Sequence, residues 1–342
     1  MTSRLIATLG LASLLVGPSY ADDKPGTRAP ATSAPSAKEL VKQAIEAASK
    51  DDLARGIALA EQALKGSPDD REALFLLGVL SINQADEAKG KAEKVALFHK
   101  SSDAFARLRA RYKEFSPQEA EFAAGARLGD ARALALEGKP GPALAAVKGL
   151  LAEGFDRFEA IEAEPDFAPV LKLPEFAAEF RAGIVAGVDY AMARSKSFPF
   201  DFELKDTDEK PVALADYKGK VTVVDVWGTW CPPCRKEIPH FVDLLKEYRG
   251  RGLEVVGINC NEEGSPAEVR KTIKDFAKEQ KIDYRCLLND DKTESKIPGF
   301  QGYPTTLFLD RAGKVRLTLV GYTPKARLEA IVAKLLGEGP KS

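Results

Sequence analysis

Two cysteines separated by two prolines are the clearest sign of chemistry in this chain of 342 residues. Cys231 and Cys234 follow Trp230 in the run WCPPC, and an apolar run, VTVVDVW at 221–227, precedes them. A cysteine at the turn between a strand and a helix faces the unpaired N–H groups of that helix, and these stabilise its thiolate. Cys234 lies one helical turn further on, so it can attack a mixed disulfide formed by the first cysteine. The pattern predicts thiol-disulfide exchange, with Cys231 as nucleophile and Cys234 as resolving thiol.

Two other uses of cysteine fit this sequence less well. A zinc site needs two ligands besides the pair, and the remaining candidates have unsuitable spacings: Cys260, Cys286, His99 and His240. A peroxidase of the peroxiredoxin kind needs a threonine three residues before its reactive cysteine, but Gly228 occupies that place before Cys231. We therefore expect no metal and no peroxidase chemistry here.

The elements that must position the cysteines follow from a change of periodicity after Ser197. Phenylalanines alternate at 198, 200 and 202 in the manner of a strand, and near-continuous apolar runs of the kind found in buried parallel strands come next. The expected strands are 221–227, 253–259, 305–310 and 314–321, and the expected helices are 237–248, 266–281 and one beginning at Pro324. The order strand, helix, strand, helix, strand, strand, helix predicts an α/β domain.

Two segments of this region carry a family resemblance. The run VVDVWGTWCPPCRKEIP at 223–239, followed by GYPTTLFLDRAGKV at 302–315, resembles the TlpA and ResA branch of the thioredoxins. The shared features are the apolar strand, Trp230, CPPC, Pro239 within the following helix, and Pro304. The resemblance implies a thioredoxin-like fold over 197–339 and a thiol-disulfide oxidoreductase, for which we expect no cofactor.

The resemblance also implies roles for residues around the sulfurs. Pro304 follows Tyr303, and the bond between them is expected to be cis and to face the sulfurs, where it shapes a substrate groove; the alternative is an ordinary turn proline. Trp230 is expected to cover an edge of the disulfide, with simple packing as the alternative. We assign substrate contacts to Trp230, Tyr303, Pro232 and Pro233, and the last two also stiffen the turn.

Two acidic residues are candidates for proton transfer. Asp225 lies in the apolar strand where thioredoxins keep a buried aspartate, and desolvation there would raise its pKa and suit it as a base for Cys234. Glu237 lies three residues after Cys234, where the ResA-like branch has a glutamate near the sulfurs; the alternative is a solvent-facing acid on the helix. In the ResA pattern the strand position is not acidic, so this chain departs from it by having both, and their titration is expected to be coupled.

The other cysteines and histidines have weaker patterns. Cys260 and Cys286 fit free buried thiols, although a second disulfide or a redox relay remain alternatives, and we leave them off the site. His99 and His240 fit the surfaces of helices.

Residues 37–194 predict a second, all-helical domain. Apolar residues at 53, 57, 60, 63 and 64 mark one helix face, GSP at 66–68 ends that helix, and Asp69 or Asp70 can cap the next. A second pair is expected from Pro117 to Glu137 and, after GKPG at 138–141, through Leu151. This arrangement resembles tetratricopeptide repeats, although the spacing is irregular. The domain is expected to bind a protein partner; the alternative is an alanine-rich bundle without a recognition groove.

The first residues predict export. Arg4, an apolar core from Leu5 to Val16 and small residues before position 22 are typical of a signal peptide over 1–21. The apolar core is too short for an ordinary membrane span, although an uncleaved anchor remains the alternative. Residues 22–36 contain three prolines among small polar residues and predict a disordered linker. We expect a soluble periplasmic or other extracytoplasmic protein.

The sequence therefore favours an exported protein-disulfide reductase. Fifty basic residues balance 51 acidic ones without a dense basic run, so no nucleic acid partner is implied. The expected partners are substrate proteins with disulfides, cytochrome c maturation being one candidate process, and a protein electron donor, expected to be a membrane thiol-disulfide transporter. The alternatives are a disulfide oxidase or isomerase, since sequence does not set the direction of electron flow, and a redox-switched interaction scaffold.

Overall fold

The structure is a computed structural model that describes residues 35–290 and 292–337. The expected signal peptide and all but the last two residues of the expected linker lie outside this range. The chain divides into two compact units, and the described residues of each lie within the following ranges: Met1–Leu150 with Glu159–Phe176, and Leu151–Phe158 with Ala177–Ser342. The helical domain was expected to reach residue 194, but the structure groups Ala177–Arg194 with the second unit. The domain limits as such stay a prediction.

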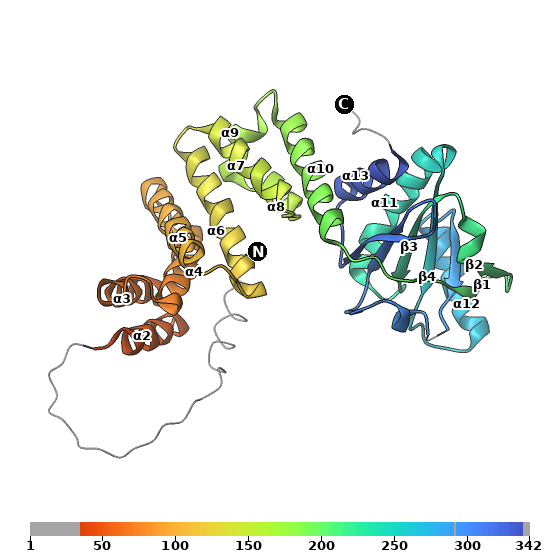
Figure 1. The fold of residues 1–342 in the computed structure, drawn as a ribbon, viewed down its shortest axis with the longest axis horizontal. Coiled ribbons are helices and arrows are strands. Elements are labelled where there is room, and N and C mark those ends of the chain that lie inside the picture. The colour runs from red at the N-terminus through yellow and green to blue at the C-terminus, as the bar shows by residue number, and fades with distance from the viewer. Residues whose placement is uncertain (1–34, 291, 338–342) are drawn as a thin grey trace, which may run out of the picture. The chain divides into compact units, whose positions relative to one another are not determined.

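The first part of the chain is helical (Figure 1). Its elements are α2 (Ala37–Ser49), α3 (Leu53–Gly66), α4 (Arg71–Glu87), α5 (Lys91–Arg111), α6 (Pro117–Leu136), α7 (Pro140–Ala152), α8 (Phe158–Glu162), the 3-10 helix η2 (Pro165–Phe167), α9 (Ala168–Leu171) and α10 (Phe176–Arg194). The helix expected from its apolar positions is α3, which buries all five of them. Asp70 caps α4 by accepting a hydrogen bond from the Ala73 N–H, as the sequence allowed.

Small residues let the helices of the first unit approach closely. A Cβ atom at Gly78 of α4 would lie 2.5 Å from a ring carbon of Phe105 in α5. A Cβ atom at Gly56 of α3 would likewise lie 2.7 Å from Leu80. Since real Cβ atoms do not come so close to other atoms, only glycine fits at either position without a shift. The helix pairs α3·α4 and α4·α5 therefore depend on these two glycines.

The second unit contains a seven-stranded mixed sheet. After α10, its elements are β1 (Glu203–Asp206), β2 (Pro211–Ala213), η3 (Leu214–Tyr217), β3 (Val221–Trp227), α11 (Pro232–Tyr248), η4 (Arg249–Arg251), β4 (Leu253–Asn259), α12 (Pro266–Glu279), β5 (Arg285–Leu288), η5 (Glu294–Lys296), β6 (Thr305–Leu309), β7 (Val315–Val320) and α13 (Lys325–Leu336). The strand order is β2-β1-β5-β4-β3-β6-β7. This confirms the expected α/β fold beside a helical N-terminal region.

The central strand β3 is buried along its whole length because both faces of the sheet are covered. Val223 and Trp227 lie in one core cluster together with buried side chains of α10, α11, α12 and α13. Val224 and Val226 lie in a second cluster, together with Phe200, Phe202 and residues of the β1–β2 hairpin. Continuous apolar sequence in this strand therefore follows from burial on two sides.

The sheet differs from the sequence expectation in three places. Residues 198–202 form no strand, although Phe200 and Phe202 are buried in the core. The short strands β1, β2 and β5 were not expected, and α11 begins at Pro232 rather than at 237. Each missed strand has only three or four residues, too few for alternation to be recognised.

Within the described part of the chain, no helix has both the length and the apolar character to cross a membrane.

Candidate active site

Three loops meet at one edge of the sheet. Strands β3 and β4 are parallel, with Trp227 opposite Asn259, so the segments that follow both strands emerge side by side. Strand β6 runs antiparallel to β3, with Thr305 opposite Val226, so the segment that precedes β6 lies at the same edge. The fold thus brings the WCPPC loop, the turn after β4 and the loop containing Pro304 together.

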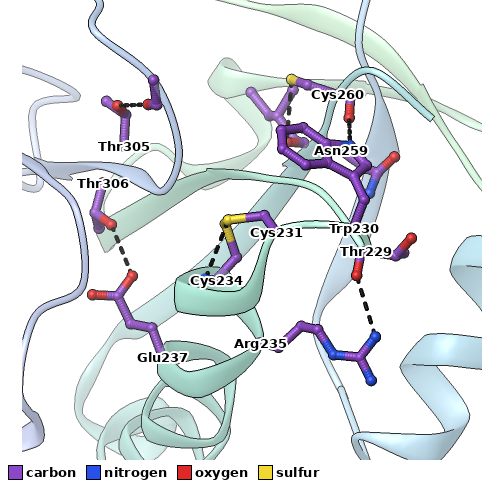
Figure 2. Close-up of a disulfide and its surroundings, with 12 residues drawn as sticks. Thr229, Trp230, Cys231, Cys234, Arg235, Glu237, Asn259, Cys260, Thr305 and Thr306 are labelled. Atoms are coloured by element: carbon purple, nitrogen blue, oxygen red, sulfur yellow. Dashed lines mark hydrogen bonds between the residues drawn. A yellow bond between two sulfur atoms is a disulfide. The ribbon is translucent and has the colours of Figure 1, made fainter. Parts of the chain in front are cut away.

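Cys231 and Cys234 form a disulfide at the start of α11 (Figure 2). Their Cα atoms are 5.3 Å apart. Cys231 is the N-cap residue of the helix, and its Sγ atom accepts a hydrogen bond from the backbone N–H of Cys234 at 3.3 Å. When the disulfide is reduced, the same N–H group and the positive end of the helix would stabilise a thiolate at Cys231. The site can therefore perform thiol-disulfide exchange.

Trp230 is the large exposed side chain next to the disulfide. The two cysteines are buried, whereas half of the Trp230 surface is exposed. Its indole N–H donates to the carbonyl of Cys260 at 3.1 Å, and its ring meets Tyr303 edge to face, with the ring centroids 5.2 Å apart. A Cβ atom at Gly228 would lie 2.4 Å from the indole nitrogen, so glycine is required there. Trp230, the residue before Cys231, is thus held in place with half of its surface exposed.

The loop before β6 has the expected cis bond between Tyr303 and Pro304. Pro304 is buried, and its carbonyl accepts from the N–H of Gly321 at 2.8 Å. The hydroxyl of Tyr303 donates to the carboxylate of Glu294 and accepts from the side-chain amide of Asn261 at 2.8 Å. Tyr303 is therefore held from two sides. The substrate contacts assigned to Trp230, Tyr303, Pro232 and Pro233, and the position of Pro304 facing the sulfurs, stay predictions.

Glu237 is completely buried, so the alternative of a solvent-facing acid is wrong. Its Oε1 atom accepts from the N–H of Thr323 at 2.7 Å, and its Oε2 atom accepts from the hydroxyl of Thr306 at 3.5 Å. Burial outweighs these bonds and raises the pKa of Glu237 from 4.5 to about 7. Figure 2 shows the side chain projecting from α11, one turn after Cys234, toward Thr306. It can therefore exchange a proton near neutral pH.

Asp225 is buried in the middle of β3, opposite Thr306 on β6. Neither carboxylate oxygen has a hydrogen-bond partner among the described residues. Burial, with a further contribution from the charge of Glu237, raises the pKa of Asp225 well above its usual range. Negative charge on Glu237 therefore opposes ionisation of Asp225, and the coupled titration of the two acids stays a prediction. Their roles in proton transfer stay predictions.

The other cysteines are free and buried, so they form no second disulfide. Burial raises the pKa of Cys286 to about 12, and burial together with Glu294 raises the pKa of Cys260 even further. Neither thiol is therefore a ready nucleophile. His99, in the first unit, is partly buried and hydrogen-bonded to Asp130 and Glu137. Within 35–290 and 292–337, no three His, Cys, Asp or Glu side chains form a group that could hold a metal ion.

The turn after β4 contributes residues that we did not expect from the sequence. Glu262 binds Thr229, two residues before Cys231, through both carboxylate oxygens, at 2.6 Å to its N–H and 2.8 Å to its hydroxyl. Asn259 donates to the same carboxylate at 3.0 Å. The sequence feature that could have indicated these residues was the polar run NCNEEG at the end of an apolar strand. The carboxyl ends of neighbouring parallel strands lie at the same edge of a sheet, so a polar run there lies close to the segment that follows β3.

Known proteins resemble the second unit. A family described as "AhpC/TSA family" matches residues 196–318. A thiol-disulfide oxidoreductase ResA of Bacillus cereus is 30% identical over 138 residues, which cover 40% of this chain and 75% of that protein. ResA of Bacillus subtilis (strain 168) is 31% identical over 35% of this chain and 64% of its own length. A crystal structure of a thioredoxin-family thiol:disulfide interchange protein from Chlorobium tepidum TLS is 34% identical, covers 42% of this chain and 99% of that one, and has a TM-score of 0.37.

The fold and the disulfide at the start of α11 define a thioredoxin-like thiol-disulfide oxidoreductase. With the sequence similarity, they establish that this chain belongs to the ResA family of thiol-disulfide oxidoreductases, with an additional helical N-terminal region.

Proposed function

We propose that the protein is an exported protein-disulfide reductase. The observation that carries the proposal is the position of the Cys231 sulfur, which caps α11 and accepts from the Cys234 N–H. That position suits a thiolate nucleophile. The printed name of its relatives, thiol-disulfide oxidoreductase, supports the reaction class.

The reaction begins with the reduced pair. The Cys231 thiolate attacks one sulfur of a substrate disulfide, so that a new S–S bond forms and the substrate bond breaks, and the departing substrate thiolate takes up a proton. Cys234 then loses its proton to the pair of buried acids and attacks the Cys231 sulfur. The second substrate thiol is released, and the Cys231–Cys234 disulfide remains, which is the form seen in Figure 2.

The buried acids favour reduction over oxidation. A strongly oxidising pair has a reduced form that is stabilised, with a low thiol pKa. Glu237 is on the same helix as Cys234, one turn further on, and its charge acts on Asp225 in β3. Negative charge on either acid opposes a thiolate at the neighbouring sulfur and raises the thiol pKa. A dithiol with a raised pKa gives up electrons more readily at equilibrium, as a reductase must.

Export and partners complete the proposal. The N-terminal sequence supports secretion to the periplasm or another extracytoplasmic space, where disulfides form and persist. A pair kept reduced there needs a protein electron donor, which we propose to be a membrane thiol-disulfide transporter. Apocytochrome c and damaged extracytoplasmic thiol proteins are the proposed substrates, on the strength of the family resemblance.

The helical unit is proposed to bind a protein partner. A hollow of about 540 Å³ lies over α3, α4 and α5, and its lining carries both signs of charge, with Lys100 paired to Glu61 at 2.6 Å. Asp103→Lys changes the charge of this hollow, whereas Lys38→Glu changes an exposed site on α2 outside it. In full-length protein, we expect the first substitution alone to weaken capture of partner proteins.

Reduction of a model protein disulfide tests the function. The full chain, supplied with dithiothreitol, should reduce insulin, and Cys231→Ser should abolish this activity. Cys234→Ser should instead accumulate covalent complexes with substrate, because the resolving thiol is missing. Activity that survives Cys231→Ser would contradict the mechanism.

A further inference from the structure

The turn after β4 contacts both other loops of the site. It comprises Cys260, Asn261 and Glu262 together with Asn259, the last residue of β4, and we name it the 259–262 turn. Asn261 has a φ angle of 56°, in the left-handed region that asparagine tolerates better than most residues. Consecutive residues of the turn can therefore reach different neighbours.

Two residues of the 259–262 turn bind the loop that carries Cys231. Both oxygens of Glu262 accept from Thr229, one from the backbone N–H and one from the hydroxyl. The buried amide of Asn259 donates to the same carboxylate and holds it in place. In addition, the carbonyl of Cys260 accepts from the indole of Trp230, which Figure 2 shows as a dashed line. The two residues just before Cys231 are thus tied to β4.

The same turn binds the loop that carries Pro304. The side-chain amide of Asn261 donates to the hydroxyl of Tyr303 at 2.8 Å, and Tyr303 directly precedes Pro304. One short turn therefore spans the two loops that flank the disulfide.

We propose that Glu262 is a positioning residue for the reaction of Cys231. Its two bonds to Thr229 hold the loop so that the Cys231 sulfur stays within reach of the Cys234 N–H at the start of α11. This inference rests on the proposed function, since it takes Cys231 as the reacting thiol. Among the described residues, the Glu262 side chain bonds to Thr229 and Asn259 and to neither sulfur, so its effect passes through Thr229.

A matched pair of substitutions separates the effect of the hydrogen bonds of Glu262 from the effect of its negative charge. Glu262→Gln removes the negative charge but can keep all three bonds, because its oxygen can accept from the Thr229 N–H and from Asn259 while its amide donates to the Thr229 hydroxyl. Glu262→Ala removes the charge and the bonds together. Any difference between the two variants therefore reports the bonds alone.

Alkylation of the reduced protein by iodoacetamide is the measurement. In the full chain with Cys234→Ser, burial raises the pKa of the Cys260 and Cys286 thiols, so these react slowly and the fast reaction reports Cys231. At pH 6 we expect Glu262→Ala to react about tenfold more slowly than Glu262→Gln, since the released loop stabilises the thiolate less. Equal rates in the two variants would overturn the proposal.

A smaller change covers the case in which Glu262→Ala does not fold. Thr229→Val removes only the hydroxyl bond, and Thr229→Ser keeps it. We expect the valine variant to react about two- to threefold more slowly than the serine variant, and equal rates would contradict the proposal. Alkylation does not depend on the direction of electron flow, so a failure here is distinct from a failure of wild-type protein to reduce insulin.

Discussion

The carboxylate of Glu237 accepts a hydrogen bond from the backbone N–H of Thr323 at 2.7 Å, so the helix that begins at the disulfide is joined to the segment after β7. The hydrogen bond gives one carboxylate oxygen of this completely buried acid a partner, but the partner carries no positive charge to balance the carboxylate. The pKa of Glu237 is raised to about 7, so both protonation states are populated near neutral pH. The proton that Glu237 binds therefore affects the stability of the fold, and its proposed effect on the chemistry of Cys234 stays a prediction.

The first expected outcome is the pH dependence of stability. Because the folded pKa of Glu237 is raised, the folded state holds a proton that the unfolded state releases above about pH 4.5, and stability falls as the pH rises toward 7. Glu237→Gln removes this effect while its side-chain oxygen can still accept from Thr323. Urea unfolding should find the variant and the wild type similar at pH 4 and the variant about 3 kcal/mol more stable at pH 8. A constant difference at both pH values would contradict the raised pKa.

The second expected outcome concerns the resolving step, in which Cys234 attacks the mixed disulfide. If Asp225 takes the proton of Cys234, Asp225→Asn should slow the release of the mixed disulfide by about 100-fold while attack by Cys231 changes little. Rapid quenching with acid followed by mass spectrometry would measure both steps. Asp243→Asn, which changes an exposed carboxylate on the same helix as the disulfide, serves as the control. Unchanged release in Asp225→Asn would assign the proton to another group.

The third concerns substrate contact by Trp230. Trp230→Ala removes an exposed aromatic face that also packs on Tyr303, and such aromatic contacts contribute about 0.5–1.5 kcal/mol. We expect KM for a protein disulfide to rise about two- to tenfold with little change in kcat, and Trp230→Phe to recover most of the loss. If KM is unchanged in the alanine variant, Trp230 only packs against the loop.

The fourth concerns the helical unit. Gly78→Ala would force Phe105 to move, so it should destabilise this unit by about 1–3 kcal/mol. Gly66→Ala is the control, because nothing lies within 4 Å of its new Cβ atom in the same type of helix, and alanine there should stabilise by up to about 1 kcal/mol. Thermal unfolding measures both variants. Equal melting temperatures would mean that the α4·α5 contact is not as close as described.

Local features were the most predictable from sequence. The strand before Cys231, the helix after it and the cap at Asp70 depend on residues close together in the chain. The cis bond before Pro304 was expected from the family pattern rather than from the residues alone. These expectations needed no knowledge of the sheet order.

Contacts between distant segments were not predictable in the same way. The bonds from Glu262 to Thr229 exist because β4 lies beside β3 in a particular register, which periodicity does not specify. The burial of Glu237 depends on Thr306 and Thr323, which come from later strands and loops. Tertiary packing decides each of these features.

The reduction potential of the Cys231–Cys234 pair tests the central claim most directly. Equilibration of the full chain with glutathione or dithiothreitol redox buffers, read out by thiol labelling, would give its value. A reductase with two buried acids, Asp225 and Glu237, in its active-site strand and helix should lie near the value of thioredoxin, about −270 mV. A value near about −120 mV, typical of strong oxidants such as DsbA, would contradict the proposed reduction and make the protein a disulfide oxidase.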